Sequence, residues 1–116
     1  MTRTRKIFDS TSIPWRSFEH NTNNVFVKDL SNKEFSEHFN ISLFRVERDG
    51  EFPIHNHSHS YIMHFLSGTG ELLVEQRLTN AKPGLVAKIE SNEDHGYRNT
   101  GRDDLILIVL NTPATR

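Results

Sequence analysis

The feature that most constrains the fold is a regular series of short strand-type segments. From Val25 onward, segments rich in β-branched and aromatic residues are separated by glycine, asparagine, aspartate and serine at intervals of about eight to twelve positions. This spacing is typical of an all-β sandwich or barrel. We expect only a single helical turn, near Ser31, and strands over residues 25–30, 40–48, 52–57, 61–66, 71–78, 85–89, 96–99 and 104–111.

The length of 116 residues suits one domain with a core of its own. Residues 1–20 place Trp15 and Phe18 among polar residues, and we expect an N-terminal arm that lies across a barrel or a partner subunit. Residues 21–116 then form a single barrel. The run 105–110 is apolar on both faces of its strand, so both faces must be covered. We therefore expect a homodimer in which this strand or the arm around Trp15 contributes to the interface.

Composition excludes several classes of function. Fourteen basic and fifteen acidic side chains give a net charge of −1, so we expect no nucleic-acid partner and no anionic membrane. Cysteine is absent, which excludes disulfides and leaves any metal to nitrogen and oxygen ligands. The sequence shows no apolar run long enough to cross a bilayer and no signal-peptide pattern, so we expect a soluble, cytoplasmic protein.

The chemically most informative stretch is "FPIHNHSHSYIMHFLSGTGEL", residues 52–72, which holds four of the seven histidines within ten positions. Strand alternation places His55, His57, Tyr61, Met63 and Phe65 on one face. Two imidazoles at i and i+2 on one face can bind a single metal ion. Taken alone, this pair is a weak signal, because H-x-H arises easily in a chain with seven histidines.

The spacing around these histidines resembles the first motif of the cupin superfamily, which is a glycine, a short gap, H-x-H, three or four residues, a glutamate, six residues and a glycine. Here the corresponding residues are Gly50, His55, His57, Tyr61 and Gly68. The tyrosine replaces the glutamate of the family. A mononuclear site of three histidines and a glutamate is therefore not present as the family has it.

The second cupin motif is a glycine, five residues, P-x-G, two residues, a histidine, three residues and an asparagine. This chain keeps the spacing with Gly84, Glu90, Asn92, His95 and Asn99, although Glu90 replaces the proline and Asn92 the second glycine. Asparagine tolerates a left-handed backbone better than any residue except glycine.

This resemblance implies a jelly-roll (double-stranded β-helix) barrel in which His55, His57 and His95 hold one divalent metal ion. It favours Fe(II), with manganese, nickel or zinc as alternatives. Tyr61 is the candidate catalytic residue, through a hydrogen bond to substrate or metal-bound water or as a general acid. The alternatives are an ordinary barrel-lining aromatic and a direct ligand. His59 lies in the turn at the barrel mouth, where it contacts either solvent or substrate.

Three functions remain open at this point. The first is a metal-dependent enzyme, a dioxygenase, isomerase or lyase, that acts on a small oxygenated or anionic compound. The second is a non-catalytic module that binds a sugar or organic acid, because the stretch 52–72 also resembles the N-terminal cupin domain of arabinose-type regulators. No helix-turn-helix follows the last strand before Arg116, so we expect no direct contact with nucleic acid. A structural or storage cupin with a vestigial site is a third interpretation.

Overall fold

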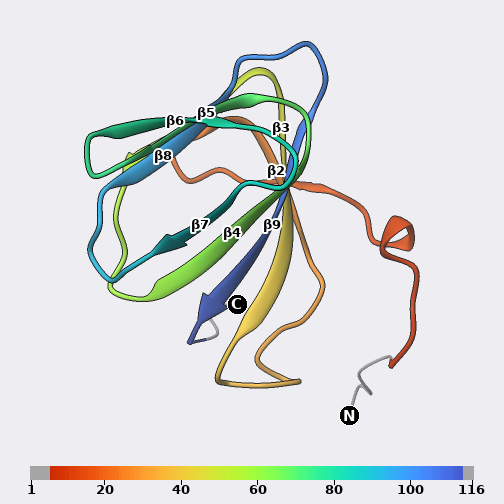
Figure 1. The fold of residues 1–116 in the computed structure, drawn as a ribbon. Coiled ribbons are helices and arrows are strands. Elements are labelled where there is room, and N and C mark those ends of the chain that lie inside the picture. The colour runs from red at the N-terminus through yellow and green to blue at the C-terminus, as the bar shows by residue number, and fades with distance from the viewer. Residues whose placement is uncertain (1–5, 114–116) are drawn as a thin grey trace.

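The structure, a computed structural model that describes residues 6–113, is a curled antiparallel sheet of nine strands (Figure 1). The strands run in the order β6-β5-β8-β3-β9-β4-β7, with β2 beside β3 and β1 beside β2. Their bounds are β1 Arg16–Ser17, β2 Asn23–Asp29, β3 Asn40–His55, β4 Ser60–Ser67, β5 Gly70–Val74, β6 Arg77–Ala81, β7 Val86–Ile89, β8 His95–Asn99 and β9 Leu105–Thr112. The predicted all-β jelly roll is confirmed.

In the part of the chain that the structure describes, helical structure is confined to single turns. A 3₁₀ turn spans Ser10–Ser12, and a second turn forms where the Ser36 amide donates to the Asn32 carbonyl at 3.2 Å. The second turn confirms the single turn expected near Ser31. Within residues 6–113 there is no helix that is long and apolar enough to cross a membrane.

Three strand boundaries differ from the sequence prediction. Residues 40–48 and 52–57 were expected as separate strands, but they form one long strand, β3, which bends at Asp49 with φ 64°. The strand predicted over 71–78 is a hairpin, because Glu75 and Gln76 both adopt positive φ in a two-residue turn. Neither residue is a typical signal for such a turn. The arm, expected to lack a strand, pairs briefly with β2 through β1.

The two halves of β3, on either side of the bend, pair with different strands. Its first half pairs with β9, from Asn40↔Asn111 to Val46↔Leu105, and its second half pairs with β8. Inward side chains of β2, β3, β4 and β9 fill one end of the barrel with the apolar core, which includes Val27, Val46, Phe65, Leu105 and Leu107, none of them exposed. The histidines lie at the other end, where the core gives way to a cavity.

The N-terminal arm lies along the outer face of β2. The ammonium group of Lys28, itself only 6% exposed, donates to the carbonyl oxygens of Ser10 (2.9 Å) and Ile13 (3.3 Å). The Trp15 ring lies 4.4 Å from this ammonium group and 4.9 Å from the Arg45 guanidinium. These contacts place Trp15 against its own barrel, from which the chain continues to Phe18 at the cavity.

Candidate metal centre

His55 and His95 are brought together by the pairing of β3 with β8. The register shifts between Phe52↔Tyr97 and His55↔His95, so β3 contains one extra residue there, a β-bulge. The bulge lies at Pro53 and Ile54, where proline's missing amide hydrogen is tolerated. It returns His55 to the inner face that Phe52 already occupies. A side chain at Gly96 would meet the backbone of Ile54 and Phe52 at 2.9 Å, so only glycine permits this close approach.

His57 follows β3 in a loop that is fastened to the loop of the second motif. The Asn92 amide donates to the His57 carbonyl at 2.6 Å, and the Ser91 hydroxyl donates to the Ser58 carbonyl at 2.7 Å. Asn92 has φ 66°, the left-handed conformation anticipated from the sequence. The two motif loops therefore form one hydrogen-bonded unit, and the ligand-capable nitrogens of His55, His57 and His95 all lie within 4.8 Å of one another.

The outer ring nitrogens of two of these histidines contact backbone carbonyls. Nδ1 of His55 lies 2.7 Å from the Pro53 carbonyl oxygen, and Nδ1 of His95 lies 2.8 Å from that of Glu93. Since a carbonyl only accepts, each Nδ1 carries the hydrogen and each neutral ring presents Nε2 as its free lone pair. Carbonyls of this kind orient metal-binding histidines in proteins. The donor set therefore fits a divalent metal ion.

Burial keeps these imidazoles neutral. His95 is 1% exposed, and desolvation, helped by the neighbouring imidazoles, lowers its pKa to about 4. Desolvation also lowers the pKa of His55. Above pH 6.5 both rings are in the form that a metal ion requires.

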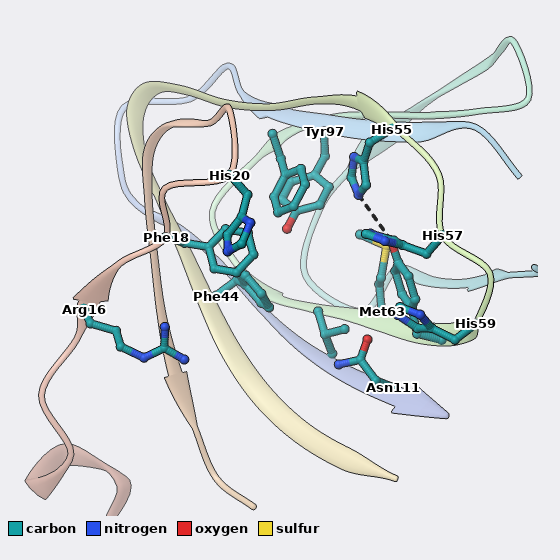
Figure 2. A pocket seen from close by; sticks show the side chains of 13 residues that line it. Arg16, Phe18, His20, Phe44, His55, His57, His59, Met63, Tyr97 and Asn111 are labelled. Carbon is teal, nitrogen blue, oxygen red and sulfur yellow. Dashed lines mark hydrogen bonds between the residues drawn. The ribbon is translucent and has the colours of Figure 1, made fainter. Parts of the chain in front are cut away.

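Tyr61 points from β4 to the same place. Its hydroxyl lies 3.5 Å from Nε2 of His55, a contact drawn in Figure 2, and is hydrogen-bonded to Nε2 of His95. Because both Nε2 atoms lack a hydrogen, the phenol is the donor. The residue at the family's glutamate position thus faces the histidine cluster, and it satisfies His95 without any metal.

The cluster lies at one side of a cavity of about 540 Å³ (Figure 2), within the usual range for small-molecule sites. Most of the residues that line this cavity were not identified from the sequence. The cavity is lined by Arg16, Phe18, His20, Phe44, Phe52, His55, His57, His59, Tyr61, Met63, Tyr97, Val109 and Asn111. Strand alternation could have identified Val109 and Asn111, which share an inward face with Leu105. The contribution of the arm through Phe18 and His20 carries no local sequence signal.

Other polar and apolar side chains near the site lie on both sides of the barrel wall. His59 lines the cavity and stacks on His57, with ring centroids 4.8 Å apart. Met63 is fully buried and lines the cavity, as its parity predicted, whereas His64 lies on the opposite face of β4. Arg98 pairs with Glu71 on the outer surface, where its guanidinium is 2.5 Å from the carboxylate.

Asn99, the last residue of the second motif, has a structural role. Its amide nitrogen donates to the carbonyls of Val46 (2.9 Å) and Asp103 (2.8 Å), and its oxygen accepts from the Gly101 amide (2.8 Å). These bonds join β8, the following turn and β3, so Asn99 maintains the turn between β8 and β9.

Comparison with known proteins agrees with this architecture. The polyketide cyclase RemF from Streptomyces resistomycificus superposes with a TM-score of 0.85 at 18% identity, over 94% of this chain and 80% of that one. KdgF from Halomonas sp. gives 0.83 at 18% identity, over 95% and 96% of the chains. A predicted oxalate decarboxylase from Thermotoga maritima gives 0.82 at 20% identity, over 92% and 98%. At these identities the likeness shows the fold alone.

A search of curated protein sequences found no match. The family profile described as "Cupin domain", in contrast, matches residues 42–111, which include both motifs and the three clustered histidines. This chain belongs to the cupin family.

Proposed function

We propose that this cupin binds one divalent metal ion through His55, His57 and His95 and acts on a small oxygenated or anionic organic compound. The observation that carries the proposal is the convergence of three histidines, whose ligand-capable nitrogens lie within 4.8 Å of one another, at the side of a cavity. Iron(II) is the favoured ion, because histidine-rich sites with open positions suit it; manganese, nickel and zinc are the alternatives. When bound, such an ion supplies Lewis acidity and a place for oxygen ligands.

The chemistry of the donor set supports an anionic or chelating substrate. Three neutral imidazoles contribute no negative charge, and the family's glutamate is replaced by Tyr61. The positive charge at the site would therefore be neutralised by the substrate. The names of two structurally similar proteins, a polyketide cyclase and a predicted oxalate decarboxylase, both refer to oxygen-rich compounds. Dioxygenase, isomerase and lyase chemistry all remain compatible with this proposal.

We propose that Tyr61 donates a hydrogen bond or a proton to the substrate. Its hydroxyl is buried beside the Nε2 atoms of His55 and His95, so a phenol proton is available at the reacting end of the cavity. A bound substrate oxygen would replace an imidazole nitrogen as the acceptor of that hydrogen bond. In this role Tyr61 orients the substrate or donates a proton to it as a general acid.

The proposal is tested by metal analysis of protein purified without a histidine tag. After incubation with Fe(II), Mn(II), Ni(II) and Zn(II) in separate samples and removal of free ions, we expect one bound ion per chain by mass spectrometry. His57→Ala and His95→Ala should abolish this uptake. His64→Ala is the matched control, since His64 lies on the opposite face of β4, and it should retain full uptake. Metal-free wild-type protein in all four samples would contradict the proposal.

The alternative function is non-catalytic binding of a sugar or organic acid. It is favoured by the hydrogen bond from Tyr61 to His95, which satisfies the imidazole without a metal. Binding of such a ligand to metal-free protein, with no uptake of any of the four ions, would establish this second function in place of the first.

A further inference from the structure

Asn111 is a buried polar residue in the cavity that the proposed function leaves without a role. It lies on β9, is only 4% exposed and lines the cavity with the histidines. Its amide nitrogen Nδ2 is shielded from solvent and has no hydrogen-bond partner among the described residues. Buried amide groups are nearly always paired, because leaving one unpaired carries the full cost of its desolvation. An unpaired buried donor on a residue that lines a cavity therefore indicates a ligand group. Nδ2 itself has almost no accessible surface, so it would meet this group after the amide turns about the Cβ–Cγ bond.

The position of Asn111 relative to the metal centre follows from strand register. Asn111 is directly opposite Tyr61 across the antiparallel pair of β9 with β4, so both side chains are on the inner face. Tyr61 extends its hydroxyl to the histidines, whereas the shorter Asn111 stays near the sheet. Figure 2 shows the Asn111 side chain projecting from β9 toward the space enclosed by the rings and the histidines. A ligand bound at the histidines would extend from them along the Tyr61 ring toward this amide.

The wall between these two polar ends is aromatic and apolar. Phe52 lies with its ring centroid 5.2 Å from that of Tyr97 and 6.2 Å from that of Phe44, and the inner ends of Met63 and Val109 complete the wall. Flat aromatic ligands pack well against such ring surfaces. Among residues 6–113, Arg16 contributes the only guanidinium at the cavity, and this group is already paired with Asp29 at 2.9 Å.

We propose that Asn111 determines substrate specificity by turning its amide toward the cavity and donating a hydrogen bond from Nδ2 to a carbonyl or carboxylate oxygen of a flat aromatic ligand. The ligand carries its chelating oxygens at the opposite end, toward the histidines. This inference rests on the proposed function, because the histidine cluster defines the other end of the ligand. A site built to pair a polar group rejects an analogue that lacks it far more strongly than an apolar pocket does.

One test is the stability of the metal-free protein without ligand. Asn111→Leu replaces the unpaired amide with an apolar group of similar volume, so we expect Tm to rise by roughly 4 °C. Asn80→Leu, the same change at an exposed position of β6, should not raise Tm. A fall in Tm for Asn111→Leu would show that the amide supports the fold, and it would overturn the inference.

The second test measures ligand discrimination on zinc-loaded protein, where zinc avoids redox turnover. The probes are 5-acetyl-2-hydroxybenzoate and 5-isopropyl-2-hydroxybenzoate, which share a chelating end and differ in one carbonyl oxygen at the other. By calorimetry we expect the wild type to bind the acetyl compound roughly tenfold more tightly. Asn111→Leu should lose this preference at unchanged zinc content, and Asn80→Leu should keep it.

The outcomes separate this inference from the proposed function. If zinc binds but the wild type shows no preference, binds neither probe, or keeps its preference in Asn111→Leu, the role of Asn111 is refuted while the metal site stands. If zinc fails to bind but another of the four ions binds, that ion replaces zinc in the probe comparison. If none of the four ions binds, the proposed function fails, and the role of Asn111 is then judged by the stability test and by the same probe comparison on metal-free protein.

Discussion

His55 and His95 lie directly opposite each other in the antiparallel pair of β3 and β8, with their ring centroids 4.2 Å apart. Each ring is oriented by a backbone carbonyl two residues before it, Pro53 for His55 and Glu93 for His95. The two Nε2 lone pairs therefore face each other and the Tyr61 hydroxyl. This preorganisation has consequences that can be measured.

The first prediction concerns stability against pH. Because burial lowers the folded-state pKa of His95 to about 4, the unfolded chain binds a proton at this residue between pH 6.5 and 4 that the folded chain does not. The free energy of unfolding should therefore fall as the pH drops through this window, by at most about 3 kcal/mol from His95. Urea denaturation of metal-free protein at several pH values measures this slope.

The matched variants for that experiment are His95→Gln and His38→Gln. His95→Gln removes the buried titrating group and should flatten the slope between pH 6.5 and 4. His38 is exposed and outside the site, so His38→Gln should leave the slope unchanged. Equal slopes for wild type and His95→Gln would contradict the prediction.

A second prediction concerns the Tyr61 hydroxyl. Tyr61→Phe leaves the buried Nε2 of His95 without its donor, so the metal-free protein should lose about 1–2 kcal/mol of stability. Saturation with zinc should reduce this loss, because the metal then occupies the same lone pairs. Thermal unfolding with and without zinc measures both values.

Tyr97→Phe provides the comparison, since it removes the other phenol of the cavity. We expect its effect on stability to be the same with and without zinc. Metal uptake should persist in Tyr61→Phe. Complete loss of metal from that variant would instead identify Tyr61 as a direct ligand.

A third prediction concerns Asn92, whose positive φ supports the loop that holds His57. Asn92→Ala keeps the β-carbon in the left-handed conformation but loses the short polar side chain that makes asparagine tolerant of it, so it should cost about 1 kcal/mol of stability, together with weaker metal binding. Asn92→Gly restores the family's glycine and should retain both properties. Chemical denaturation and metal titration of the two variants provide the measurement. Equal stability and equal metal affinity of Asn92→Ala and Asn92→Gly would refute the prediction.

The fourth prediction is a homodimer, which we propose from the outer face of the sheet. The outward residues Ile106, Ile108 and Leu110 of β9 are only half-buried. Register places Ile62 of β4 and Ile41 of β3 beside Leu110, so an apolar surface extends over three neighbouring strands. A second copy of the same surface would cover it about a twofold axis.

Sedimentation velocity tests this proposal. Wild-type protein should sediment as a dimer, and Ile108→Glu should convert it to monomer. Ile54→Glu introduces the same charge at an exposed position on the other half of β3, and this variant should remain dimeric. A wild-type monomer at high concentration would refute the dimer.

Much of the fold and of the candidate centre could be predicted from local patterns. Alternation along β4 placed Tyr61, Met63 and Phe65 inward and Ile62 outward, because strand geometry sends successive side chains to opposite faces. The spacing of the second motif identified His95 despite the changes at Glu90 and Asn92. Such features depend on neighbours in sequence, so the sequence determines them by itself.

Other features were decided only by tertiary structure. The bulge at Pro53 and Ile54 brings His55 opposite His95, and its position depends on how closely β8 can approach at Gly96. The cavity likewise needs Phe18 from the arm and Asn111 from the last strand, residues 93 positions apart in the chain. Local periodicity specifies which face a residue occupies along one strand. Which residues meet across strands, and how much space they leave, depends on packing between distant segments.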